Sequence, residues 1–117
     1  MKAAQRTSWK NIAMPGKRER LDYAPFFQDS EADQLQLGLI PEEMEDKWFI
    51  FFEEGWLNFH RSWTGHCIFS MRLEGSPAGV RTIEVWVNRN MDQYNSQGST
   101  ADIELLDGLI KNYLLSR

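Results

Sequence analysis

The side chains best suited to chemistry are concentrated between residues 56 and 86, where apolar and polar residues alternate. His60, Ser70 and Glu84 supply the residue types of an acid–base or nucleophilic site, in which a histidine exchanges a proton with a hydroxyl or a carboxylate. His60 and Ser70 are expected to be diagonal neighbours on adjacent strands, about 7–8 Å apart at Cβ. Their spacing matches no known nucleophile motif. The pattern therefore favours a hydrogen-bonded structural histidine over a catalytic one.

A second group of residues, Glu53, Trp56 and Arg72, is expected to meet on adjacent strands. An arginine stacked on a tryptophan and held by a carboxylate can bind a planar or phosphorylated ligand. The simpler interpretation, which we favour, is a cross-strand ladder that the N-terminal segment covers. Both interpretations place Trp56 and Arg72 on one face of a sheet.

Metal binding would have to use His60 and His66, which are expected to lie diagonally on one face. Cys67 follows His66 directly and should point to the opposite face, so it cannot complete the same site. Two ligands are too few for a structural metal. We therefore expect no metal and no cofactor, and interpret Cys67 as a buried, inert thiol.

The elements that must position these residues are four strands, expected at residues 47–53, 56–62, 66–73 and 80–88. Glu54-Gly55 is typical of a two-residue hairpin turn, which pairs Glu53 with Trp56. The next hairpin is expected to close through residues 63–65, with Gly65 in the left-handed conformation. This three-residue loop pairs Phe59 with Phe69 and Leu57 with Met71, whereas a shorter turn would place the apolar residues on different faces.

This register predicts two unlike faces of the sheet. An apolar face should receive the C-terminal helix, and an opposite face should mix aromatic with charged residues. The apolar set is Trp48, Ile50, Phe52, Leu57, Phe59, Cys67, Phe69, Met71, Leu73, Ile83, Val85 and Val87. The rows expected on the mixed face are Phe49–His60–Ile68–Trp86, Phe51–Asn58–Ser70–Glu84 and Glu53–Trp56–Arg72–Thr82.

The whole chain is expected to form one α+β domain, a four-stranded antiparallel β-meander with the C-terminal helix packed on one face. Residues 1–45 are irregular and partly helical and should wrap the sheet, residues 46–88 form the meander, and residues 99–116 form the helix. The helix carries an apolar stripe at helical spacing, and Ser99 or Thr100 is expected to cap it. The polar loop 89–98 is equally consistent with a functional loop and with a flexible connection.

Charge is unevenly distributed along the 117 residues. Residues 1–20 carry six bases and one acid, and residues 21–54 carry ten acids and one base, within a total net charge of −4. An acidic protein is a poor general binder of nucleic acid, because contacts with phosphate dominate that affinity. The chain has no run of about 18 apolar residues that would span a membrane, no secretory leader in its first ten residues, and one cysteine. We expect a cytoplasmic protein.

The stretch 46–68, and above all the string Phe59-His60-Arg61-Ser62-Trp63-Thr64-Gly65, resembles a core found in small, functionally uncharacterised bacterial proteins. Similar cores occur beside or fused to modules that process ADP-ribose. The resemblance implies a bacterial intracellular protein and suggests a nucleotide-like substrate, but it brings no catalytic assignment. In structural terms, Arg61 and Trp63 should project to the helix side at the margin of the sheet, where they cover the rim or edge a pocket.

The leading hypothesis for function is a small binding or interaction module without catalysis, similar to an immunity or accessory protein. It would act through the mixed face or through the acidic segment 29–46, on a protein partner with a basic surface. The alternative is a binder or enzyme for a nucleotide or ADP-ribose that stacks the base on a tryptophan and holds phosphate with Arg72. The candidate ligand-binding residues are Trp56, His60, Arg61, Trp63, Arg72, Glu84 and Trp86.

Overall fold

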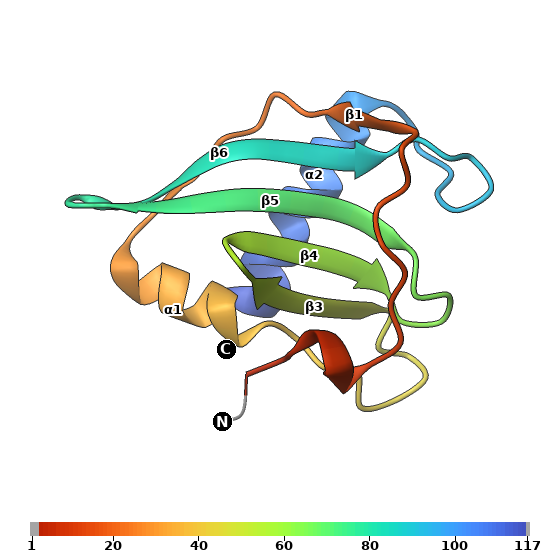
Figure 1. The fold of residues 1–117 in the computed structure, drawn as a ribbon, viewed down its shortest axis with the longest axis horizontal. Helices are drawn as coiled ribbons and strands as arrows, with labels where there is room; N and C mark the ends of the chain where they lie inside the picture. The colour runs from red at the N-terminus through yellow and green to blue at the C-terminus, as the bar shows by residue number, and fades with distance from the viewer. Residues whose placement is uncertain (1–2, 117) are drawn as a thin grey trace.

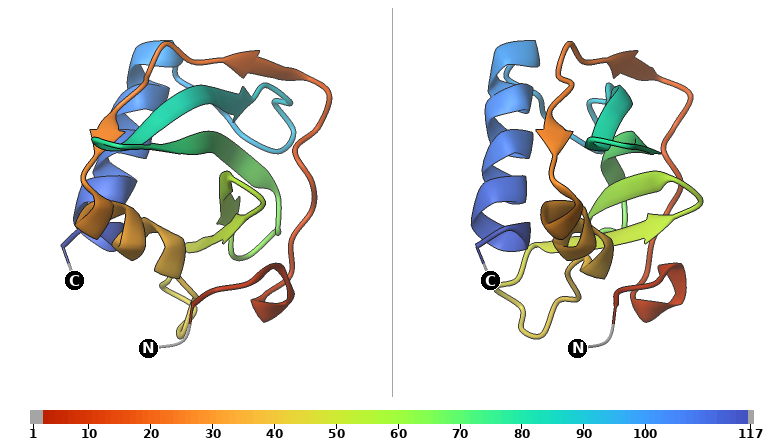
Figure 2. Two further views of the ribbon diagram at one scale, coloured as in Figure 1. Left: turned by 60° about the vertical axis from the view of Figure 1, so that its left-hand side comes forward. Right: turned by 90° about the vertical axis from the view of Figure 1, so that its left-hand side faces the viewer.

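The computed structural model describes residues 3–116 and builds them around one antiparallel sheet. The strand order is β1-β6-β5-β4-β3, and a further short strand, β2, also pairs with β6. Helix α2 covers one face of the sheet, while the N-terminal segment runs on the opposite side (Figure 2, right). The fold is therefore the expected α+β arrangement, a β3–β6 meander with a C-terminal helix.

The central meander consists of β3 (Trp48–Glu53), β4 (Trp56–Arg61), β5 (Cys67–Ser76) and β6 (Gly79–Asn88) (Figure 1). The β3–β4 register confirms the predicted turn at Glu54-Gly55, with Glu53 opposite Trp56. The predicted partners Leu57–Met71 and Phe59–Phe69 are also confirmed in the β4–β5 register. Gly65 has φ 82°, as the three-residue loop requires.

A β-bulge between Phe59 and His60 makes one prediction about the faces wrong. Cys67, not Ile68, lies opposite His60. The extra residue reverses the alternation at the start of β5. As a result, Ile68 is buried in the main core, and Cys67 lies on the mixed face with its Sγ 3.4 Å from the Oγ of Ser70.

The predicted pairing of the fourth strand is also wrong, by two residues. The β5–β6 hairpin continues to Ser76 and Gly79, and this longer hairpin places Trp86 opposite Ser70 and Glu84 opposite Arg72. A second bulge follows Arg72, where Leu73 pairs with Thr82. Ile83 therefore lies outside the main core, while Thr82 is buried and donates a hydrogen bond to the carbonyl of Pro25 at 2.7 Å. The position of the β5–β6 turn sets this register, and composition alone did not locate that turn.

The N-terminal segment contributes two strands that periodicity did not predict, β1 (Arg18–Arg20) and β2 (Phe26–Phe27), both paired with β6. A short 3₁₀ turn, η1 (Arg6–Ser8), precedes them. Ile12 forms a bridge with His66, so the segment crosses the mixed face near the end of β4 and the start of β5 (Figure 1).

Two helices complete the domain. α1 (Asp29–Leu37) begins where the Glu31 carboxylate accepts the backbone N–H of Gln28 at 2.8 Å. α2 (Ser99–Leu109) starts after Gly98, so the predicted cap at Ser99 or Thr100 is wrong by one or two residues. The expected α-helix to residue 116 instead widens into a π-helical turn, η2 (Ile110–Leu114).

The main core fills the space between the sheet and α2, with α1 at one end. Its largest fully buried members are Phe59 and Phe69, whose ring centroids are 6.2 Å apart. A smaller apolar cluster of Ala4, Phe49 and Phe51 lies on the other side of the sheet, under the N-terminal segment. Within residues 3–116, no helix combines the length and the apolar character that crossing a membrane requires.

The polar loop 89–98 is fixed in place by a buried carboxylate. Asp102 is fully buried on α2 and forms a 2.7 Å ion pair with Arg89. It also accepts hydrogen bonds from the hydroxyls of Tyr94 at 2.6 Å and Ser96 at 2.9 Å. Arg89 continues the network to Glu19, which joins the loop to β1. These contacts give the loop a structural role, which the sequence left open.

Candidate functional site

His60 lies in a buried aromatic cluster rather than in a catalytic arrangement. Its ring is stacked on Phe51, with centroids 5.4 Å apart, and is tilted against Phe49 at 6.0 Å. Its Nδ1 lies 2.9 Å from the carbonyl oxygen of Gly65. Burial lowers the pKa of His60 below its ordinary value of 6.5, so the neutral ring is preferred.

The groups expected to work with His60 have other partners. The Oγ of Ser70 donates to the side-chain oxygen of Asn58 at 3.1 Å and lies 3.4 Å from the Sγ of Cys67. Burial raises the pKa of the Cys67 thiol to about 11, which keeps it protonated and unreactive. Glu84 accepts the indole N–H of Trp86 at 2.6 Å. The predicted structural role for His60 therefore describes the contacts better than an acid–base site does.

Acidification is expected to destabilise the protein through His60. Because the folded state lowers this pKa, the unfolded chain binds the additional proton, and the stabilisation present above pH 6.5 is lost as pH falls below 6.5. In urea unfolding measured between about pH 7.5 and about pH 5.5, the free energy of unfolding should fall by at most about 1.4 kcal/mol per pH unit.

The matched variants for this prediction are His60→Phe and His66→Gln. His60→Phe should remove most of the pH dependence of the unfolding free energy over this interval, because the phenyl ring of the variant does not titrate. His66→Gln should retain the dependence. An unchanged pH dependence in His60→Phe would show that another group is responsible.

Trp56 and Arg72 are paired across β4 and β5, as the register predicted. Trp56 is half-buried and Arg72 is exposed. The carboxylate of Glu53, however, pairs with Arg6 of the N-terminal segment at 3.1 Å. Arg6 thus provides the cation that the sequence assigned to Arg72.

Trp86 is also engaged by the N-terminal segment. The guanidinium carbon of Arg18 lies 4.9 Å from the centre of the Trp86 ring, a cation–π contact. Arg18 belongs to β1, directly beside β6. One face of the ring is consequently covered, which disfavours Trp86 as a platform for a nucleotide base.

Arg61 and Trp63 lie at the margin of the sheet and line a cavity of about 190 Å³ together with Lys47 and Thr64. The guanidinium carbon of Arg61 lies 5.1 Å from the centre of the Trp48 ring. Trp63 is 61% exposed, yet its indole N–H donates to the carbonyl of Met44 at 2.8 Å. Of the residues singled out in the sequence, these two are the ones that lie together beside a cavity.

A larger cavity of about 540 Å³ is also lined by Trp63. We call it the acidic groove; its lining residues are Trp9, Lys10, Glu42, Glu43, Met44, Ser62 and Trp63. The indole N–H of Trp9 donates to the carbonyl of Ser62 at 2.7 Å, so both tryptophans are held by backbone carbonyls. Neither this cavity nor the smaller one is lined by Trp56, His60, Arg72, Glu84 or Trp86.

The acidic loop beside the groove is held in a defined conformation by its own side chains. Asp46 Oδ2 accepts the backbone N–H groups of Glu42 at 2.9 Å and Glu43 at 3.1 Å. The Oγ of Ser62 donates to the carbonyl of Asp46 at 2.6 Å. The acids of residues 42–46 are thus presented by an ordered turn, attached to the end of β4.

Sequence reasoning identified Trp63 and the acidic segment but not their combination with Trp9 and Met44. Met44 is 75% exposed and Trp9 38% exposed. The signal available in the sequence was an apolar residue, Met44, within a run of acidic residues. An exposed apolar side chain in such a place often marks a surface that a partner covers.

Comparison of the chain with protein-family models, with curated proteins and with solved structures finds no match. The resemblance of residues 46–68 to bacterial cores therefore stays a prediction. Within residues 3–116, no three side chains of histidine, cysteine, aspartate or glutamate gather as metal ligands would.

Proposed function

We propose that this protein is an interaction module without catalytic activity, which binds a basic segment of a partner protein in the acidic groove. The observation that supports the proposal is the pair of exposed tryptophans, Trp9 and Trp63, which line one cavity together with Met44. Tryptophan is the residue type most enriched among those that dominate binding energy at protein interfaces.

The groove is organised for binding before a partner arrives. The indole N–H groups of Trp9 and Trp63 already have carbonyl partners, so covering the rings leaves no unpaired donor behind. Their conformations are restricted by these bonds, which reduces the entropy lost on association. Met44 adds an adaptable apolar side chain that can adjust to the shape of a partner.

Charge favours a basic partner. Among the described residues that line the groove are two acids, Glu42 and Glu43, and one base, Lys10. Residues 21–54 as a whole carry ten acids and one base. A segment with lysine or arginine beside a large apolar residue complements this combination. Charged residues at the edge of a binding site raise the association rate and make it depend on salt concentration.

The proposal is tested by selecting a random-peptide library on the wild-type protein after depletion on Trp63→Ala. Selected sequences should combine basic with aromatic or aliphatic residues. The consensus peptide should bind Trp63→Ala about thirtyfold more weakly than wild type, the equivalent of about 2 kcal/mol. Affinity should also fall severalfold when NaCl rises from about 50 mM to about 500 mM.

The control is the pair Met44→Ala and Met91→Ala, which make the same change at two exposed positions. Met44→Ala should weaken peptide binding and Met91→Ala should not. Failure to recover any peptide that discriminates against Trp63→Ala, or recovery of acidic peptides, would overturn the proposal.

Binding of a nucleotide or ADP-ribose at Trp56 and Arg72 is a second candidate, favoured by their confirmed pairing and by the exposure of Arg72. It ranks lower because His60 and Trp86, which would complete the site, are already covered by Phe51 and Arg18. Titration with ADP-ribose, followed by tryptophan fluorescence, distinguishes the candidates. A saturable change that Arg72→Ala abolishes would favour the second one.

A further inference from the structure

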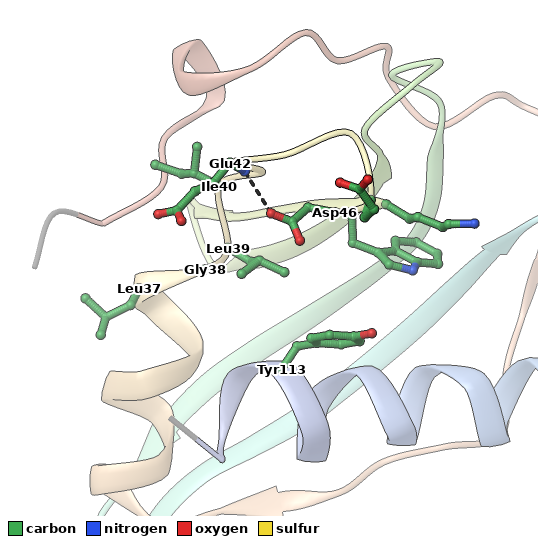
Figure 3. A pocket seen from close by; sticks show the side chains of 10 residues that line it. Leu37, Gly38, Leu39, Ile40, Glu42, Asp46 and Tyr113 are labelled. Carbon is green, nitrogen blue, oxygen red and sulfur yellow. Dashed lines mark hydrogen bonds between the residues drawn. The ribbon is translucent and has the colours of Figure 1, made fainter.

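A separate cavity of about 520 Å³ also borders the acidic loop, residues 42–46. It is lined by Leu37, Gly38, Leu39, Ile40, Glu42, Glu45, Asp46, Lys47, Trp48 and Tyr113. Figure 3 shows the Tyr113 ring and the Asp46 side chain across the cavity from each other, with Leu39 beside them. Its volume suits a small organic group.

Tyr113 reaches this position from the π-helical turn η2. Leu115 donates its backbone N–H to the carbonyl of Ile110 at 2.9 Å, the five-residue spacing of a π-helix. Ile110 and Leu114 face the core, while Tyr113 is 51% exposed and lines the cavity. Such widened turns occur frequently at functional sites.

The charges around the cavity favour a cation. Among the described residues that line it are three carboxylates, those of Glu42, Glu45 and Asp46, and one base, Lys47. Asp46 Oδ2 is engaged by the backbone of the acidic loop, and its carboxylate charge faces the π-surface of Tyr113. A cation that lies between a carboxylate and an aromatic ring is stabilised by an ionic hydrogen bond to the first and by a cation–π contact with the second.

Trp48 provides an independent observation. It lines the cavity and is only 7% exposed, and its indole N–H has no acceptor among residues 3–116. A largely buried indole usually donates a hydrogen bond. The nitrogen is not sealed from solvent, and an oxygen of a ligand in the cavity would accept this N–H in place of water.

The geometry points to a binding site for an organic cation that also carries an oxygen acceptor, a guanidinium or ammonium group of the size of an arginine or lysine derivative. Either a free amino-acid-like molecule or an arginine or lysine side chain of a bound peptide supplies this chemistry. The site differs from the acidic groove in its lining, sharing only Glu42.

The test titrates L-arginine and Nα-acetyl-L-arginine N-methylamide into the full chain and follows backbone amide shifts by NMR. Shifts should centre on Leu39, Lys47 and Tyr113. L-citrulline and its capped derivative, which replace the guanidinium by a neutral urea, should bind at least about tenfold more weakly. Preference for free arginine assigns the site to a small molecule, and equal or tighter binding of the capped form assigns it to a peptide side chain.

Two variants and one control complete the experiment. Tyr113→Leu removes the π-surface, and Asp46→Asn removes the charge while keeping an oxygen acceptor for the loop; each should weaken binding about tenfold. Glu104→Gln makes the same charge change at an exposed position on α2 outside the cavity and should leave affinity unchanged. Binding of neither arginine compound, or equal binding of citrulline, would overturn the inference. The peptide selection on Trp63 is unaffected by either result, so the two proposals fail separately.

Discussion

Replacing Gly38 by alanine is expected to lower the free energy of unfolding by about 3 kcal/mol. A Cβ at this position would lie 2.1 Å from the carbonyl oxygen of Ile50 and 2.9 Å from the Cβ of Ala4. Gly38 also has φ 66° and ψ −156°, a conformation that residues with a side chain rarely adopt. Both the contact and the conformation must change for alanine to be accommodated.

Gly38 also lines the cavity proposed to bind an organic cation, so its replacement is expected to disturb that site as well. Leu39, the next residue, exchanges two 2.9 Å backbone hydrogen bonds with Ile50 of β3 and forms a wall of the cavity beside Tyr113. Urea unfolding measures the loss of stability. Gly16→Ala is the matched control, because its Cβ would have no neighbour within 4 Å and the change should cost less than about 0.5 kcal/mol. Equal stability of the two variants would contradict the packing described for β3.

Replacing Asp102 by alanine is expected to cost about 3 kcal/mol. Its carboxylate is fully buried and serves Arg89, Tyr94 and Ser96 together. Removing it leaves the partly buried Arg89 guanidinium without its closest partner and two hydroxyls without an acceptor. The start of α2 should loosen together with the loop 89–98.

Asp92→Ala is the control for this prediction, since Asp92 lies in the same loop with an exposed side chain. It should change stability by less than about 0.5 kcal/mol. Hydrogen exchange of the α2 amides provides the second measurement, and faster exchange is expected in Asp102→Ala only. A loss below about 1 kcal/mol in that variant would show that the network contributes little.

The sequence was sufficient to predict the two hairpins that close at Gly55 and Gly65, because loop length and the apolar pattern specify the same register there. It was insufficient at the start of β5. A bulge at His60 adds one residue, and no side chain in the pattern signals it, so Cys67 and Ile68 exchange faces. The β5–β6 pairing failed for a related reason, since the position of its turn was ambiguous in residues 74–79, which contain two glycines and one proline.

The candidate site was predicted only in part, because its contacts are long-range. The hydrogen bond from Trp63 to Met44 spans 19 residues, and the bond from Trp9 to Ser62 spans 53. Alternation within strands places residues on faces, but it gives no information on how a loop and an N-terminal segment meet at the sheet margin. Tyr113 lies at helical spacing from Leu106, Leu109 and Ile110, so the sequence places it in the apolar stripe of the C-terminal helix. The π-helical turn that exposes it has no periodic signature.

The most direct test of the proposed function follows the five tryptophan indole N–H signals by NMR while the selected basic peptide is added. Trp9 and Trp63 should shift with a common saturation curve, and Trp56 and Trp86 should stay unchanged, because the former pair line the acidic groove and the latter lie on the mixed face of the sheet. Shifts of Trp56 and Trp86 without a change at Trp9 and Trp63 would contradict the account and move the binding surface to the sheet.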